Sequence, residues 1–212
     1  MSPLLQVSVG EGTLTFGMVF TAFFVMLGPV KIIAPFAKLT AGMEEGAARR
    51  LALEATGIAC AGGIVAAIFG QRILASWDIS LNALRLAAGL VLLLVALRAT
   101  LDQYAPPQEA PTAEGRGNLA FSPLAFPMIL TPYGLAILIL ILAVFGGLER
   151  DAAVFAIFLL VMLLDLAVMW FARAIVHRGG WILALFGAVL VVMQVALAVE
   201  LILDALRALG VW

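Results

Sequence analysis

Long apolar runs alternate with short polar interruptions along the chain. A transmembrane helix needs about 20 apolar residues, and six runs come close to or exceed this length. They are, approximately, Thr13–Phe36, Leu51–Gly70 and Ala83–Leu101, then Leu119–Phe145, Ala152–Ala172 and Trp181–Leu203. The runs are continuous, whereas strands of a membrane barrel alternate apolar and polar positions. The pattern predicts an all-α integral membrane protein with six transmembrane helices.

A polar segment separates the runs into two groups of three. Residues 105–118 contain Pro106, Pro107 and Pro111, and prolines cannot sustain a regular helix. We therefore predict an N-terminal three-helix repeat at 1–104, a Pro-rich linker at 105–118 and a C-terminal three-helix repeat at 119–212.

The opening run of each half is interrupted near its middle. The first contains Met26-Leu27-Gly28-Pro29, and the fourth contains Ile129-Leu130-Thr131-Pro132. A proline removes a backbone hydrogen bond, so helices 1 and 4 are expected to be broken. Because three spans per half is an odd number, the two halves must lie in opposite orientations. Inverted repeats with broken helices are typical of secondary transporters.

Composition supports a membrane protein and excludes several other classes. Hydrophobic residues make up 65% of the chain and charged residues 12%, so polar groups are too few to cover a water-facing surface. A formal net charge of -1 offers no basic face for nucleic acid. The single cysteine, Cys60, and single histidine, His177, give no disulfide framework and no metal motif. Without a catalytic or nucleotide-binding motif, we expect no cofactor and no enzymatic activity.

The distribution of Lys and Arg between alternate loops predicts the orientation. One side collects seven basic residues and the other three, and the richer side should be cytoplasmic. Both termini then face outward and the Pro-rich linker lies inside. The seven are Lys38, Arg49, Arg50, Arg98, Arg116, Arg173 and Arg178; the three are Arg72, Arg150 and Arg207.

Two charged residues fall inside predicted spans. Lys31 follows Pro29 closely, and Asp165 lies in the middle of the fifth run. A charge at the bilayer centre costs about 2.5 to 3.5 kcal/mol, so we hypothesise that Lys31 and Asp165 form an ion pair, acting as a structural lock or as a proton-coupled gate. The alternative is that Lys31 snorkels to the interface and Asp165 is neutral.

Glu200 and Asp204 are four residues apart and share a face near the end of the sixth run. We interpret them as an interfacial helix end, with Arg85 expected to neutralise one of them.

Several motifs resemble those of the MarC family of bacterial inner-membrane proteins, and the resemblance covers nearly the whole chain. They are Leu84-Arg85-Leu86-Ala87-Ala88-Gly89, Pro123-Leu124-Ala125-Phe126-Pro127 and Thr131-Pro132-Tyr133-Gly134, together with the Met26–Pro29 segment. The family is similar in outline to amino-acid exporters of the LysE type. The resemblance implies a multi-pass protein of the bacterial inner (plasma) membrane, with periplasmic termini, that transports small solutes such as neutral amino acids.

The chain departs from the family pattern at both interruptions. The family asparagine before Pro29 is Gly28 here, and the family glycine before Pro132 is Thr131, with Tyr133 inserted ahead of Gly134. The family also usually has uncharged residues at positions 31 and 165. A divergent substrate, or loss of transport, would follow from changes at these positions.

If the two interruptions face each other, their free backbone groups and helix N-termini would form a site for a carboxylate and an amine. The alternative is a pair of simple proline kinks. The expected partners are the lipid bilayer and a small-molecule solute. A non-transporting subunit or scaffold that assembles with a membrane-protein partner, and a homo-oligomer, stay open. The predicted substrate-binding residues are Gly28, Pro29, Lys31, Thr131, Pro132, Tyr133, Gly134 and Asp165.

Overall fold

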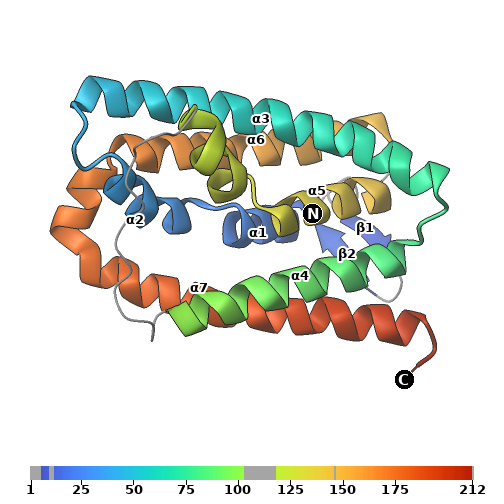
Figure 1. Cartoon of the computed structure of the whole chain (residues 1–212). Coiled ribbons are helices and arrows are strands. Elements are labelled where there is room, and N and C mark those ends of the chain that lie inside the picture. Colours follow the sequence, from blue (N-terminus) through green and yellow to red (C-terminus); the bar gives the residue numbers. More distant parts are fainter. Residues whose placement is uncertain (1–5, 10–11, 103–117, 146, 212) are drawn as a thin grey trace.

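The computed structural model describes residues 6–9, 12–102, 118–145 and 147–211. The chain begins with an antiparallel hairpin in which β1 (Gln6–Val9) pairs with β2 (Gly12–Thr15). All longer elements are helices (Figure 1). The predicted linker at 105–118 lies outside the described residues except for its last position.

The first half contains four helices where three runs were predicted. The first run is divided between α1 (Phe16–Met26) and α2 (Pro29–Leu39). The second and third runs correspond to α3 (Glu45–Ser76) and α4 (Leu81–Asp102). The Thr15 side chain accepts a hydrogen bond from the Met18 amide and so caps α1.

The second half follows the same order. An irregular helical segment, η2 (Ala120–Ile129), contains Pro123 and Pro127, and it leads into α5 (Pro132–Phe145). The two segments are bent relative to each other by 59°. Then come α6 (Leu148–Trp170) and α7 (Ala172–Ala208), which is kinked at Gly179.

Five helical segments of the described chain are long and apolar enough to cross a membrane, and the bent η2–α5 pair makes six if it counts as one span. The joined segment Phe16–Leu39 is counted among the five. The prediction of a helical integral membrane protein is therefore confirmed. Two spans are longer than expected, since α3 and α7 begin before the apolar runs that predicted them.

The helices form three layers, with the interrupted segments in the middle (Figure 1). α3 and α6 pack together on one side, and α4 and α7 form the most extensive helix pair on the other. The α1–α2 and η2–α5 segments lie between them. The interrupted segments are thereby placed in the bundle interior, where protein surrounds their backbone.

Small residues allow the helices of this bundle to approach closely. Alanines spaced along α3 are buried, and a Cβ at Gly63 would lie 2.4 Å from the ring of Phe158. The Phe158 ring also meets Phe23 edge to face, with centroids 6.2 Å apart. Lipid provides no hydrophobic drive for helix association, so close packing of this kind holds the helices together.

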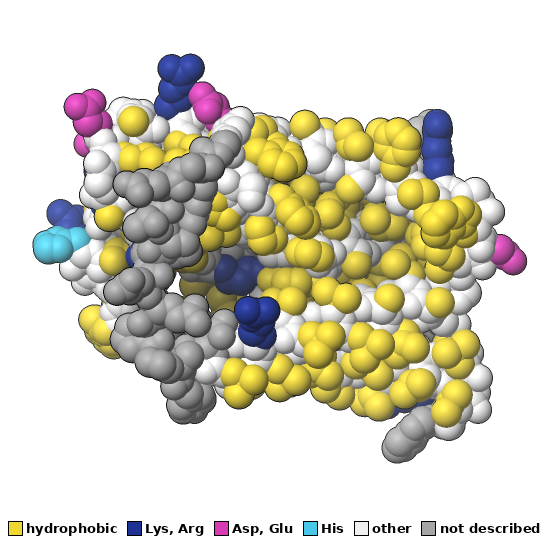
Figure 2. Space-filling model, in the orientation of Figure 1, with side chains coloured by type: hydrophobic (Ala, Val, Ile, Leu, Met, Phe, Trp, Pro, Cys, Tyr) yellow, Lys and Arg dark blue, Asp and Glu magenta, His cyan; other side chains and the backbone are white. Residues whose placement is uncertain are grey.

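The outer surface suits a hydrocarbon environment. Figure 2 shows hydrophobic side chains across most of one face, with charged side chains mainly toward its two ends. Large apolar side chains such as Leu94, Leu163 and Val192 are exposed in the isolated chain. In a bilayer these side chains contact acyl chains rather than water.

Substitution of Gly89 tests the close packing of α4 against α7. A Cβ at Gly89 would lie 2.8 Å from Ile202 Cγ1 and 2.9 Å from the Ala198 carbonyl oxygen. We expect Gly89→Ala to lower the free energy of unfolding by about 1 to 3 kcal/mol, as overpacking does. Thermal unfolding of the purified protein in detergent measures the change.

Gly57→Ala is the matched control, because nothing lies within 4 Å of a Cβ built at Gly57 on α3. It should be neutral or stabilise the helix by up to about 1 kcal/mol. Equal losses from both substitutions would show that α4 and α7 do not pack as described.

Candidate functional site

The two chain interruptions touch each other inside the bundle. Leu27 and Gly28 connect α1 to α2, and Leu130 and Thr131 connect η2 to α5. Leu27 is fully buried, and a Cβ added at Gly134 would lie 2.2 Å from its Cδ2 atom. Segments about one hundred residues apart are thus in van der Waals contact, and Leu27 fills the space between them.

Local chemistry explains why each helix begins where it does. Pro29 occupies the first turn of α2, where its missing N–H removes no helical hydrogen bond. The preceding Gly28 lies so close to the end of α1 that a Cβ there would be 1.5 Å from the Phe24 carbonyl oxygen. At the other interruption, the Thr131 hydroxyl caps α5 by accepting a hydrogen bond from the Gly134 amide at 3.1 Å.

Lys31 joins the two interruptions directly. Its amine donates to the Met26 carbonyl at the end of α1 and to the Tyr133 hydroxyl, at 2.7 Å, in the first turn of α5. The amine also lies 4.9 Å from the centroid of the Tyr133 ring, within the range of a cation–π interaction. Lys31 therefore satisfies a carbonyl that has no helical partner, and it links one half of the chain to the other.

Asp165 on α6 lies inside the bundle. It is 0% exposed, and neither carboxylate oxygen has a hydrogen-bond partner among the described residues. The direct Lys31–Asp165 ion pair that we hypothesised is not formed, because the amine of Lys31 is directed to Met26 and Tyr133 instead. The two groups still lie within electrostatic range of each other.

Gln194 on α7 completes the cluster and was not among the predicted site residues. Its buried amide donates to the Val25 carbonyl at 3.0 Å, so it satisfies a second carbonyl at the end of α1. The side chains of Thr131 and Gln194 both approach the Tyr133 hydroxyl. A signal was present in the sequence, since Gln194 is the only polar side chain between Trp181 and Val199. We call Lys31, Thr131, Tyr133, Asp165 and Gln194 the central polar cluster.

The structure brings together most, but not all, of the predicted site. Pro132 starts α5, but it is exposed and does not belong to the buried cluster. Asp165 belongs to the cluster, but its carboxylate oxygens form no hydrogen bond with the other members. The predicted site residues that meet at the two interruptions are Gly28, Pro29, Lys31, Thr131, Tyr133 and Gly134.

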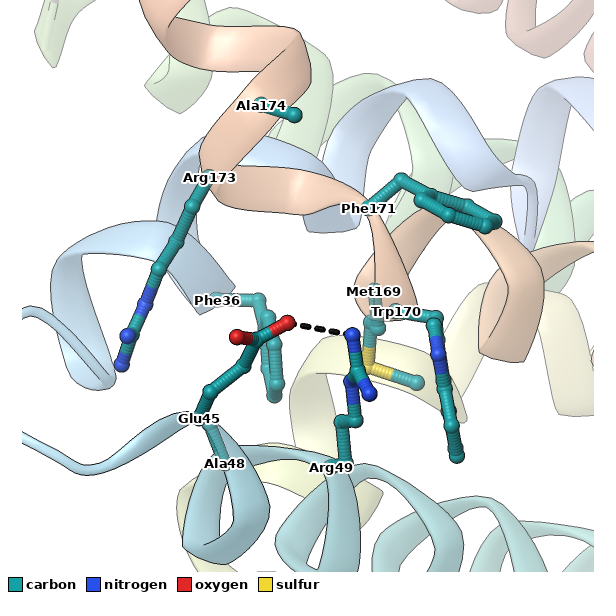
Figure 3. Close-up of a pocket in the computed structure, with 9 residues that line it drawn as sticks. All are labelled: Phe36, Glu45, Ala48, Arg49, Met169, Trp170, Phe171, Arg173 and Ala174. Carbon is teal, nitrogen blue, oxygen red and sulfur yellow. Dashed lines mark hydrogen bonds and ion pairs between the residues drawn. The ribbon is translucent and has the colours of Figure 1, made fainter.

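A separate pocket of about 240 Å³ opens at the end of the bundle where α2, α3, α6 and α7 come together. Its floor is apolar, and its rim carries Arg49, Trp170 and Arg173 (Figure 3). The sequence analysis did not identify it. The available signal was the placement of arginines and a tryptophan at the ends of two different runs, with Arg49 before the second run and Trp170 and Arg173 at the end of the fifth.

The acidic pair at the end of α7 has a different partner from the one expected. Arg207 lies 3.6 Å from Glu200 and 3.2 Å from Asp204, and all three side chains are exposed. Arg85 instead donates to Asn82 within α4. The expectation that Arg85 neutralises one of the two carboxylates was therefore wrong. Arg207 does so instead, because it lies on the same helix as Glu200 and Asp204.

Comparison with known proteins identifies the family. A family model described as MarC family integral membrane protein matches residues 14–209, which include both interruptions and all the described helices. No curated protein and no solved structure matches the chain. The resemblance inferred from the sequence motifs is confirmed.

A double-mutant cycle tests the contact between the two halves. We expect Tyr133→Phe to lower the free energy of unfolding by about 1.5 to 3 kcal/mol, the range for a hydrogen bond to a charged group. In a Lys31→Met background the same substitution should cost less than about 0.5 kcal/mol, because the hydroxyl has lost the amine. Thermal unfolding of the four proteins gives the coupling, and additive effects would contradict the Lys31–Tyr133 contact.

Proposed function

Because the chain belongs to the MarC family of integral membrane proteins, we propose that it is a secondary transporter of small solutes such as neutral amino acids. It acts in the bacterial inner membrane and is not an enzyme. One observation carries the proposal: an interruption from each half of the chain meets the other at the central polar cluster, inside an apolar bundle.

The central polar cluster is difficult to explain as packing alone. A buried polar group without a hydrogen-bond partner lowers stability, and Asp165 leaves both carboxylate oxygens unpaired in the described structure. Ionisable residues at membrane depth usually mark a pathway for a substrate or an ion. The destabilising placement of Asp165 therefore favours a role in transport.

The chemistry around the interruptions suits a zwitterion. The Lys31 amine and the beginnings of α2 and α5 favour a carboxylate, because helix N-termini carry partial positive charge. The Asp165 carboxylate and the carbonyls at the end of α1, at Val25 and Met26, favour an ammonium group. A neutral amino acid carries both groups on one carbon, so it could engage both sets.

Alternating access would require the two interruptions to separate. In the conformation described here, Leu27 packs on Gly134 and Lys31 bonds to Tyr133, so a solute has no room between them. We propose that rocking of one half against the other breaks these contacts. The arrangement of the helices supports inverted repeats, since α3 packs with its counterpart α6 and α4 with its counterpart α7 (Figure 1).

We further propose that Asp165 couples the opening to a proton. When Lys31 leaves Tyr133, its amine can move toward Asp165, which then gives up a proton and forms the ion pair that the closed state lacks. The described titratable groups on the helices packed against α6 that interact electrostatically with this carboxylate are Lys31 on α2 and Cys60 on α3.

A non-transporting membrane subunit is the second candidate. The observation that favours it is the dense contact of Leu27 with Gly134, which leaves the space between the interruptions filled. In this case the Lys31–Tyr133 hydrogen bond would lock the two halves together rather than act as a gate.

Transport by proteoliposomes distinguishes the two candidates. We expect the native protein to move labelled neutral amino acids, with a rate that depends on an imposed proton gradient. Asp165→Asn should reduce the rate by about tenfold or more, equivalent to at least 1.4 kcal/mol, and abolish the dependence on the gradient. The same substitution should change the free energy of unfolding by less than about 1 kcal/mol, because an amide of the same shape replaces a carboxyl group that is protonated in the closed state.

Asp78→Asn is the control, since Asp78 lies exposed in the turn between α3 and α4. It should leave both transport and stability unchanged. Absence of flux by the native protein under any gradient would favour the second candidate. If Asp165→Asn still transports and its rate still depends on the proton gradient, the proposed role of Asp165 is refuted, but the proposal of a transporter is not.

The proposed orientation predicts which loops are accessible from outside the cell. In a Cys60→Ala background, a cysteine in place of Ser80, between α3 and α4, should react with a membrane-impermeant maleimide applied to intact cells. A cysteine in place of Gly42, between α2 and α3, should react only after the membrane is opened. The reverse labelling would place both termini in the cytoplasm.

A further inference from the structure

The pocket at the basic end of the bundle combines an apolar floor with a charged and aromatic rim. Phe36, Ala48 and Met169 form the floor and are buried. Figure 3 shows Glu45 and Arg49 reaching from α3 across this floor, with Trp170 beside Arg49. The exposed Phe171 extends the apolar surface at the turn between α6 and α7.

Arg49 is held in place, yet part of its hydrogen-bonding capacity is unused. Its guanidinium lies 4.9 Å from the centroid of the Trp170 ring, an arrangement that orients the guanidinium plane. It also forms an ion pair with Glu45 on the preceding turn. Its Nε atom is buried and has no partner among the described residues. Of its two terminal nitrogens only Nη2 is hydrogen-bonded within the described chain, to Glu45, so the donors of Nη1 are left for an oxyanion.

Arg173 supplies a second cation from another helix. Its Nη2 atom donates to the carbonyls of Thr40 and Met43, at 2.7 Å for Met43, so it fixes the loop between α2 and α3. Both bonds use the same nitrogen, which leaves the Nε and Nη1 donors for another partner. The side chain is exposed at the pocket rim.

The position of the pocket favours a lipid over a soluble anion. It lies where four helical segments end, so its rim is at the level of lipid headgroups and its apolar floor continues into the bundle. Tryptophan is typical of this level. Basic pockets between transmembrane helices on the cytoplasmic side bind anionic headgroups. The described basic residues at this end are Lys38, Arg49, Arg50, Arg98, Arg173 and Arg178.

We propose that this pocket binds the headgroup of an anionic phospholipid. The phosphate accepts hydrogen bonds from Arg49 and Arg173, and the first carbons of the acyl chains lie against Trp170 and Phe171. Glu45 competes with the phosphate for Arg49, and their exposed ion pair is weak enough for a phosphate to displace it. The bound lipid would join α3 to α6 and α7, on the end of the bundle away from the N-terminal hairpin.

Native mass spectrometry of the full chain, released from nanodiscs of phosphatidylcholine with about one-fifth phosphatidylglycerol, tests the proposal. We expect phosphatidylglycerol to be retained in preference to phosphatidylcholine. The double variant Arg49→Gln, Arg173→Gln should lower its apparent affinity by about tenfold. Glu45→Gln, which removes the competing carboxylate, should raise the affinity, and this readout remains available if the double variant fails to fold.

The double variant Arg50→Gln, Arg178→Gln is the charge-matched control. Both arginines lie at the same end of the bundle and do not line the pocket, and Arg50 pairs instead with Glu54 at 2.9 Å. It should retain phosphatidylglycerol as the native protein does. Equal losses of phosphatidylglycerol in the two double variants would overturn the proposal, since the lipid would then be retained by the net charge of this end of the bundle and not by the pocket.

A second arm separates the lipid from a soluble anion. Inorganic phosphate or glycerol 3-phosphate, added to protein in phosphatidylcholine nanodiscs at millimolar concentration, should not raise the unfolding temperature, whereas phosphatidylglycerol should. If the soluble anions stabilise the native protein but not Arg49→Gln, the ligand of the pocket is a water-soluble phosphate and not a lipid. This lipid site does not depend on transport, and the transport assay above does not depend on this site.

Discussion

The contacts of the Lys31 amine hold the middle of this bundle together. An interruption in a membrane helix leaves carbonyl groups that water cannot reach, and each carries a penalty of several kcal/mol if it stays unpaired. Lys31 bonds to one of these carbonyls, at Met26, and Gln194 bonds to the adjacent one at Val25. Because Lys31 also bonds to Tyr133, the group that repairs the first interruption is joined to the second.

This dependence links structural stability to the proposed function. Whatever moves the Lys31 amine also exposes the end of α1 and releases the start of α5, so the two interruptions cannot change independently. Asp165 offers the amine a second partner within electrostatic range. An element with two alternative sets of contacts is what a conformational switch requires, and here both sets are available to one flexible side chain.

Several features could be predicted from the sequence because their causes are local. Twenty apolar residues in a row specify a span, and proline with a preceding glycine or threonine specifies where a helix restarts. The helix breaks next to Gly28 and Thr131 follow from this rule. The partner of Lys31 could not be predicted in the same way. Hydropathy identified two buried charges, Lys31 and Asp165, but it contained no information about the Met26 carbonyl, which becomes available only in three dimensions. The pocket at Arg49 was missed for a similar reason, since three helices contribute to its rim.

Four residues near the two interruptions, Gly28, Lys31, Tyr133 and Asp165, act on the same group in the structure, the Lys31 amine. The absence of a side chain at Gly28 allows the end of α1 to approach the start of α2, and this brings the Met26 carbonyl within reach of Lys31. Tyr133 then places its hydroxyl against the same amine, while Asp165 lies buried within electrostatic range. These residues depend on one another, because a buried lysine needs a carbonyl, a hydroxyl or a carboxylate nearby to be tolerated. A change at Gly28, Tyr133 or Asp165 would therefore alter the surroundings of the Lys31 amine, so the proposed gate behaves as one connected unit and not as four separate residues.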